Sequence, residues 1–202
     1  MSVVLNLKTL AFVGLVLWGA ASWWRDRPVQ RGPVAGEPVQ VDASGLPART
    51  VGAYTVQPFA RFEVRARVLS TTTYRMGREA DLAPVDLALG WNRMSESAVL
   101  ERLSITQSGR WYHYRWGAEG PPIPPDEIVR SSANMHLIPA SPSVQRALDA
   151  LRVGERVQLK GQLVDVSAAD GWRWKSSRSR TDSGGGACEL VWVESVTVLP
   201  PV

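Results

Sequence analysis

The sequence predicts a mostly β protein of the α+β class, in which a twisted antiparallel sheet or small barrel carries two short helices and follows an amino-terminal membrane helix. Several segments alternate apolar and polar residues with the two-residue period of a strand. Only two short segments have helical spacing, and one uncharged run near the start has the composition of a membrane segment. A chain of 202 residues is long enough for one compact domain with a short appendage.

Composition and charge exclude several classes of protein. The net charge of +4 is modest for this length, so the chain lacks the dense positive stripe of an obligate nucleic-acid binder. Nucleic acid is therefore not the expected partner. Cys188 is the single cysteine and cannot close a disulfide within the chain. Because the chain has only two histidines in addition to this cysteine, the sequence predicts no metal site and no cofactor.

Residues 1–24 are predicted to be a membrane anchor or a signal segment. Residues 9–24 carry no charge, with Lys8 before them and Arg25 after them. A helix that crosses the hydrocarbon core needs about 20 residues, so we expect residues 5–24 to contact membrane lipid. Small residues near the end of the apolar run leave a cleaved signal peptide as the alternative.

The flanking charges and the overall shape of this segment indicate opposite orientations. Three arginines follow it within a few residues, against Lys8 before it, and the positive-inside rule would then keep the body in the cytoplasm. The signal-like start of the chain instead indicates a body outside the cytoplasm. We favour the second orientation because a long domain can translocate despite its flanking charges.

A tether and a globular body are predicted after the anchor. Residues 25–53 are rich in Pro, Gly, Val and Ala without a helical or strand period, which is typical of a tether. Residues 54–202 are predicted to form a β-rich globular domain. Its clearest strand is 60–70, where four apolar residues alternate with four charged ones, so we expect a buried face and a solvated face that includes Arg67.

The remaining predicted elements are four strands and two helices. The strands are predicted at residues 110–116, 155–166, 172–177 and 188–199. The first helix is predicted within residues 141–154, between Ser141 as the cap and Gly154 as the stop. The second is predicted over residues 95–103 from the helical spacing of its apolar residues.

Residues 155–166 change the face on which they place apolar side chains. The apolar residues up to Leu163 lie on one face and those after it on the other, which predicts a bulge or barrel corner there, with Gly161 giving room for the bend. The run over residues 153–166, a turn glycine leading into a long bent strand, resembles the opening strand of an OB-fold barrel. This resemblance implies a small OB-like barrel and covers only the carboxy-terminal third of the chain.

The segment SSANMHLIPA, residues 131–140, holds the candidate catalytic residues. An extended backbone places Asn134 and His136 on one face, and a histidine beside hydroxyl groups can serve as a general base. If the protein is an enzyme, we expect a hydrolase in which His136 acts with Ser132 or Asp182. In the alternative, Asn134 and His136 only hydrogen-bond the loop before the next helix. Both are also candidate binding residues.

Three glycines precede Cys188 in the segment TDSGGGACEL. The N–H groups of consecutive glycines can face an anion, and a thiol with a lowered pKa can act as a nucleophile. No base is adjacent to the cysteine in the sequence. We therefore interpret the segment as a flexible hairpin turn followed by a small buried cysteine.

Aromatic and basic residues alternate in two of the predicted strands. Trp111, Tyr114 and Trp116 belong to one strand, and Trp172 and Trp174 belong to the other. Such sets stack on sugar rings or on the bases of single-stranded nucleic acid, which makes these five side chains candidate binding residues. In the alternative, half of each strand faces the core, which needs large aromatic side chains.

Several stretches of the body add a resemblance to a known group of proteins. They are YTVQPFARFEVRARVLS, DLAPVDLALGWNRMS, SGRWYHYRW, SSANMHLIPA and DGWRWKSSRSRTDSGGGACELVWVE, within about residues 54–198. With the anchor and the tether, they resemble a family of bacterial single-pass membrane proteins to which no activity is assigned. The resemblance implies a bacterial source, one anchor and one intact domain. With the orientation favoured above, the expected location is the inner membrane, with the body in the periplasm.

The sequence contains no G-x-S-x-G elbow, no Walker loop and no H-E-x-x-H motif. Together with the anchor, this favours a non-enzymatic binding or assembly domain of the cell envelope, whose partner we expect to be another envelope protein. Two alternatives stay open. One is the hydrolase described above, and the other is a membrane-tethered nucleic-acid or glycan binder.

Overall fold

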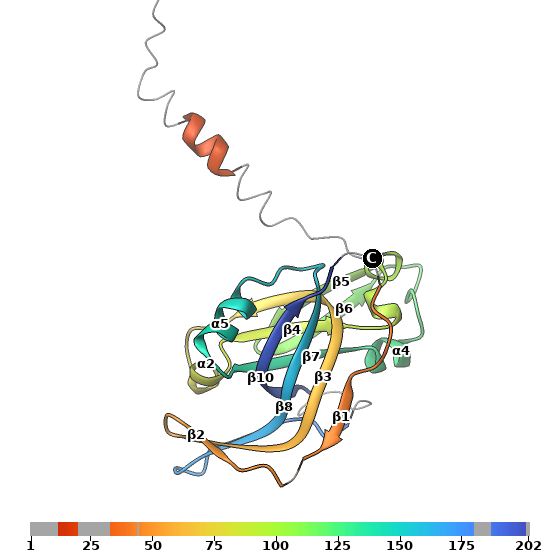
Figure 1. Ribbon diagram of the computed structural model, residues 1–202. Helices are drawn as coiled ribbons and strands as arrows, with labels where there is room; N and C mark the ends of the chain where they lie inside the picture. Colours follow the sequence, from red (N-terminus) through yellow and green to blue (C-terminus); the bar gives the residue numbers. More distant parts are fainter. Residues whose placement is uncertain (1–11, 20–32, 44, 180–186, 201–202) are drawn as a thin grey trace, which may run out of the picture.

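The structure is a computed structural model that describes residues 12–19, 33–43, 45–179 and 187–200. It is mostly β, as the sequence predicts: the described residues form an eight-stranded sheet, a two-stranded hairpin and several short helices (Figure 1). The expectation of a purely antiparallel sheet is wrong, because one pair of strands is parallel and the sheet is mixed.

The elements follow one another along the chain with short connections. The order is β1 (Val39–Asp42), β2 (Arg49–Val51), β3 (Tyr54–Thr73), α2 (Arg78–Leu82), β4 (Val85–Gly90), η1 (Arg93–Ser95), α3 (Ser97–Leu100), β5 (Leu103–Ser108), β6 (Trp111–Trp116), α4 (Pro125–Arg130), β7 (Ser132–Pro139), α5 (Pro142–Asp149), β8 (Arg156–Ala168), β9 (Arg173–Lys175) and β10 (Glu189–Val198).

The long strand β3 connects the two ends of the sheet. Its first part pairs with β8 and its last part pairs with β4, both antiparallel. β4 pairs with β7, β7 with β10, and β10 with β8, so the path of pairings that leaves β3 returns to it. The pair β7–β10 is parallel, and a parallel pair needs a long crossover connection. That connection contains α5, β8 and β9.

The register of β3 shifts twice, near Phe59 in its pairing with β8 and near Leu69 in its pairing with β4. The bulge predicted near Leu163 of β8 is found instead in β3, the strand that pairs with β8 there. The side chains of β8 still point to alternate faces of the sheet along its whole length. β8 changes its buried face for a different reason. Leu163 packs in the main core, whereas Val164 packs in a second cluster on the opposite face of the sheet.

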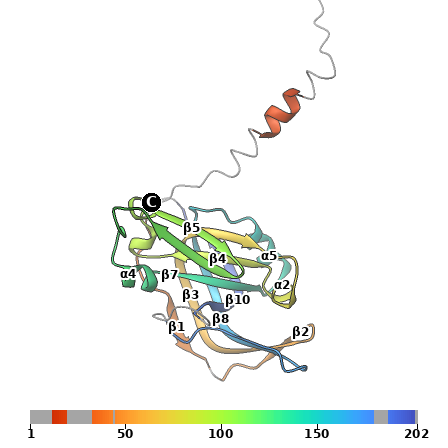
Figure 2. The same cartoon turned by 180° about the vertical axis from the view of Figure 1, so that it is seen from behind.

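The main core lies between the five strands of this closed path. β3, β4, β7, β8 and β10 each contribute alternate apolar side chains to it, and α5 covers it with Val144 and Leu148. A third cluster lies under the β5–β6 hairpin, which packs on the outer face of the sheet (Figure 2). Arg67 departs from the predicted pattern. The alternation predicts that it faces solvent, but the residue is only 5% exposed.

The two predicted helices have different outcomes. The first forms as α5, with the Ser141 hydroxyl accepting a hydrogen bond from the Val144 N–H at 3.3 Å. The second is shorter than predicted: α3 ends at Leu100, and Leu103 already begins β5, where it pairs with Trp116. The cross-strand pairing therefore overrides the helical spacing of this segment.

Two strands lie inside the segment that the sequence predicts as a tether. β1 and β2 both pair with β3, and Val34 is buried and forms a bridge to Asn92. The globular body therefore begins before residue 54. Strands of four and three residues show too little alternation to be recognised from the sequence.

The predicted membrane segment lies only partly within the described residues. Residues 12–19 are helical and exposed. Among the helices of the described ranges, none combines the length and the apolar character needed to cross a membrane.

Candidate ligand-binding site

A pocket of about 410 Å³ opens on the outer face of β7, between the β5–β6 turn and β9. This volume is within the range of small-molecule sites. We call it the Trp174 pocket. Its lining residues are Arg110, Trp111, His136, Arg173, Trp174, Lys175 and Cys188.

A buried carboxylate and a histidine form the floor of this region. Asp86 of β4 and His136 of β7 are direct partners in the sheet register, which places their side chains next to each other on one face. Asp86 is fully buried, and its Oδ2 lies 3.0 Å from Nδ1 of His136. A carboxylate at this nitrogen fixes the orientation of the imidazole ring.

Arg110 is the second partner of Asp86. Its Nη1 donates to Asp86 Oδ1 at 2.6 Å and to the Ala83 carbonyl at 2.8 Å. The guanidinium carbon also lies 3.9 Å from the ring centroid of Tyr74, a cation–π distance. A buried carboxylate without a partner costs several kcal/mol, so this arginine is a structural requirement of the site.

The turn that carries Arg110 has an unusual backbone. Gly109 and Arg110 join β5 to β6 with φ values of 56° and 70°, as in a type I′ turn. A positive φ costs an arginine about 1–2 kcal/mol. The surroundings offset this cost, because the Arg110 N–H donates to the Tyr74 hydroxyl and its carbonyl accepts from Asn134 Nδ2, both at 3.0 Å. The sheet therefore positions the turn.

Trp174 covers the histidine. It lies in β9, a strand of three residues that pairs with β8. Its ring centroid is 4.9 Å from that of His136, at an interplanar angle of 43°. The guanidinium of Arg110 lies 5.6 Å from the same indole. The imidazole is thus enclosed by a carboxylate on one side and by an indole on the other.

Two exposed cations flank Trp174 in β9. Arg173 and Lys175 line the pocket, and within the described residues neither forms an ion pair. The neighbouring Arg178, by contrast, is paired with Asp165 at 2.6 Å. The pocket thus combines unpaired positive charge with indole rings. This combination suits an anionic ligand that carries a flat or sugar ring.

Burial shifts the pKa of the phenols beneath the hairpin. Desolvation raises the pKa of the Tyr112 hydroxyl far above its ordinary value, and its hydrogen bond to Ser132 Oγ, at 3.4 Å, opposes the shift. Burial also raises the pKa of Tyr74, beside Arg110. Both phenols are therefore neutral in the folded protein at any physiological pH.

We expect the free energy of unfolding to fall as the pH rises above about 10, where an unfolded tyrosine ionises. A raised folded-state pKa gives a contribution that is complete below the unfolded pKa and is lost as the pH rises towards the folded pKa. Urea unfolding of the wild type and of Tyr112→Phe between about pH 8 and about pH 11 measures it. The variant should lose less stability over this range, and an equal loss in both proteins would contradict the prediction.

The structure brings three of the seven predicted binding residues into one pocket: Trp111, His136 and Trp174. Trp111 is 41% exposed, so its ring is open to a ligand. Asn134 lies beside the pocket and is buried. Its Oδ1 accepts from Gln107 Nε2 at 2.6 Å, and its Nδ2 donates to the Arg110 carbonyl, so it supports the turn.

The other three predicted binding residues lie elsewhere. Trp172 is half-buried, 6.2 Å from Trp174 and edge-on to Tyr54 at 5.5 Å. Tyr114 is half-buried and stacks on Trp116 at 6.2 Å, on the face of β6 opposite to Trp111. Alternation along the strand therefore divides the aromatic residues between two faces.

Of the two predicted catalytic partners of His136, Ser132 does not contact it. The Ser132 hydroxyl donates to the Ile128 carbonyl at 2.7 Å, and four extended residues, about 13 Å, separate it from His136. Asp182 lies outside the described residues. The carboxylate that contacts His136 is Asp86, which sequence reasoning missed because β4 shows no alternation: all six of its residues are buried.

Cys188 is half-buried and lines the Trp174 pocket, whereas the sequence predicts a buried residue. It directly precedes β10, and its Sγ lies 3.8 Å from Asn134 Nδ2 and 3.9 Å from the Arg110 carbonyl oxygen. Within the described ranges, no group of three or more His, Cys, Asp or Glu side chains is arranged to hold a metal ion.

No protein-family model, no curated protein and no solved structure matches this chain. The resemblance to bacterial single-pass membrane proteins therefore stays a prediction. The fold and the site therefore describe the class of this protein without assigning it to a family. The chain is a mostly β domain on a mixed sheet, with an aromatic and cationic pocket on the outer face of that sheet.

Proposed function

We propose that the chain is a non-enzymatic binding domain with an OB-like barrel, and that the Trp174 pocket binds an acidic saccharide. One observation carries this proposal: the indoles of Trp111 and Trp174 line the same pocket as Arg173 and Lys175, which have no ion pair within the described part of the chain. An indole stacks on a sugar ring, and a free cation pairs with its carboxylate.

The barrel is supported by the path of pairings, which runs from β3 through β4, β7, β10 and β8 and back to β3. The parallel pair β7–β10 and the position of α5 between β7 and β8 agree with OB-type connections. Alternate residues of all five strands pack into one core, as in the filled interior of a small barrel. In this assignment β3 is the opening strand, and residues 153–166 lead into the fourth strand instead.

The position of the pocket also supports binding. In OB-folds the ligand lies on the face of the second and third strands, between the loop that joins strands one and two and the loop that joins strands four and five. Here those strands would be β4 and β7, which carry Asp86 and His136. The loops would be those that carry Tyr74 and Trp174, both in contact with Arg110.

We further propose that residues 1–24 anchor this domain in a bacterial inner membrane, with the body in the periplasm. The uncharged run over residues 9–24, which Arg25 follows, supports an anchor. Acidic saccharides are components of envelope polymers, so such a ligand agrees with that location. Another envelope protein remains the proposed assembly partner.

Calorimetric titration with trigalacturonate, and with neutral maltotriose as the matched ligand, tests the proposed function. We expect the acidic trisaccharide to bind more tightly. The double variant Arg173→Gln/Lys175→Gln should weaken its binding by roughly tenfold, because two charge-assisted contacts are lost at an exposed site. The control variant Arg61→Gln/Arg146→Gln removes the same charge from exposed positions outside the pocket and should leave the affinity unchanged.

Equal affinities for the acidic and the neutral trisaccharide, or no binding of either, would overturn the proposal. A thymidine hexanucleotide is the third probe. If it binds more tightly than trigalacturonate and its affinity falls steeply with salt, the pocket is a nucleic-acid site and the saccharide assignment is wrong.

A further inference from the structure

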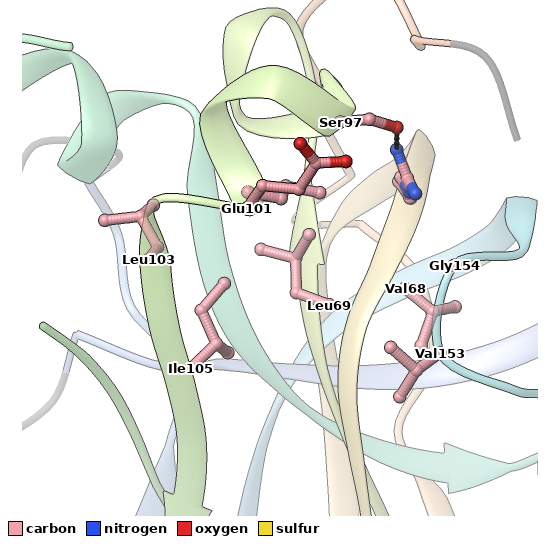
Figure 3. Close-up of a pocket in the computed structure, with 10 residues that line it drawn as sticks. Val68, Leu69, Ser97, Glu101, Leu103, Ile105, Val153 and Gly154 are labelled. Carbon is pink, nitrogen blue, oxygen red and sulfur yellow. Dashed lines mark hydrogen bonds between the residues drawn. The ribbon is translucent and has the colours of Figure 1, made fainter. Parts of the chain in front are cut away.

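A second pocket, separate from the Trp174 pocket, lies between the last part of β3, α3 and the start of β5 (Figure 3). Its volume is about 320 Å³, near the lower end of the range for small-molecule sites. It shares no lining residue with the Trp174 pocket. We call it the Arg67 pocket. Its lining residues are Arg67, Val68, Leu69, Ser97, Leu100, Glu101, Leu103, Ile105, Val153 and Gly154.

The buried guanidinium of Arg67 has only neutral partners. Its Nη1 donates to the Ser95 carbonyl and to the Ser97 hydroxyl, both at 2.9 Å. Its Nε is buried, and it has no hydrogen-bond partner in the described part of the chain. Arginine has five N–H donors, so these two bonds leave three of them unused by the described residues, two of which are on Nη2.

A charged guanidinium in this buried position is destabilised by the loss of its hydration. The residue is 95% buried, and desolvation lowers the pKa of its guanidinium. The carboxylate of Glu101 opposes this shift from a distance, but it forms no ion pair with Arg67 among the described residues. A buried cation that lacks a carboxylate is stabilised when an anionic ligand supplies one.

The rest of the pocket is apolar. Figure 3 shows Leu103 and Ile105 on β5, with Leu69 beside them and Ser97 and Glu101 above, where the dashed line joins the hydroxyl to the guanidinium. Leu69 and Leu103 are buried, and Ile105 is half-buried. A pocket with one buried guanidinium beside a surface of aliphatic side chains suits a ligand with one anionic group and a hydrocarbon chain.

We propose that the Arg67 pocket binds a small amphipathic carboxylate, whose carboxylate pairs with Arg67 and whose hydrocarbon chain lies against Leu69 and Ile105. The pocket volume limits that chain to a short or medium length. Glu101, exposed beside the pocket, repels the ligand carboxylate and so weakens its binding. This inference is independent of the saccharide proposal.

Titration calorimetry of the full chain with octanoate, and with methyl octanoate as the neutral matched ligand, tests this proposal. Octanoate is expected to bind roughly tenfold or more tightly than the ester, because only the carboxylate pairs with the buried guanidinium. Equal affinities, or no binding of octanoate at millimolar concentration, would overturn the proposal. This comparison uses the wild type and does not depend on the folding of a variant.

Three variants assign the binding to this pocket. Arg67→Met should abolish the preference for octanoate over the ester, with the fold checked by circular dichroism. Glu101→Gln is exposed, should leave the fold intact, and is expected to strengthen octanoate binding severalfold without changing ester binding. Arg173→Gln/Lys175→Gln should leave octanoate binding unchanged, and a loss of octanoate binding in that variant would place octanoate in the Trp174 pocket and overturn the proposal.

A second source of a carboxylate next to apolar groups is the free carboxyl terminus of another protein, which we call a protein tail. A short apolar peptide with a free carboxyl terminus is therefore titrated in parallel. If this peptide binds more tightly than octanoate, and Arg67→Met removes the difference, the pocket receives a protein tail and the small-ligand assignment is wrong.

Discussion

Replacing Gly161 with alanine is expected to lower the free energy of unfolding by more than about 3 kcal/mol. Gly161 lies in the middle of β8, between Phe62 of β3 and Val193 of β10. A Cβ atom at this position would overlap with the backbone carbonyl of Trp192. Because that neighbour is backbone within a paired strand, the clash can be relieved only by moving β10 away.

Urea unfolding, followed by circular dichroism, measures this effect. Gly117→Ala is the matched control, because a Cβ atom there meets no heavy atom within 4 Å and its φ is not positive. Its stability should change by no more than about 0.5 kcal/mol. Equal stability of the two variants would contradict the close approach of β8 and β10 at Gly161.

The second large effect is expected for Asp86→Asn, which should destabilise the fold by about 3–5 kcal/mol. The substitution keeps the shape of the side chain and removes the charge that Arg110 and His136 share, at 2.6 Å and 3.0 Å. Asp86 is fully buried, so water cannot replace the lost acceptor. The turn that carries Arg110 should then also be held less firmly, because the guanidinium of Arg110 loses its bond to the carboxylate.

Asp170→Asn is the matched control for this prediction. It removes one partner of the Arg78–Asp170 pair, whose atoms are 2.8 Å apart and largely exposed, so little or no loss of stability is expected. Chemical denaturation of both variants provides the comparison. Similar losses in the two proteins would mean that burial does not strengthen the Asp86 contacts, contrary to the structure.

Several elements could be predicted from the sequence because their signals are local. The alternation at residues 60–70 lies within β3, and the cap and stop residues around 141–154 enclose α5. Local signals also failed where cross-strand pairing decides the outcome. Leu103 has helical spacing but begins β5, because it pairs with Trp116 across the hairpin. β4 was missed because both of its faces are buried, which removes the alternation.

The site could be predicted only in part. His136, Trp111 and Trp174 were recognisable as residues able to bind or react, and the structure gathers them in one pocket. Asp86 and Arg110 were not recognisable, because nothing near them in the sequence shows that β4, β7 and the hairpin turn meet. Arg67 was expected in water for the same reason: α3 and β5, which cover it, are distant in sequence.

The sequence by itself determined the mostly β class, the alternating faces of β3 and β6, the capped helix α5 and the uncharged amino-terminal run. Only the tertiary structure decided which strands are neighbours, that one pair is parallel, and which polar side chains share a buried position. The physical reason is the range of the interactions. Periodicity and capping act over a few residues, whereas the partners of Asp86 and Arg67 are 24 to 50 residues away along the chain and meet only when the sheet forms.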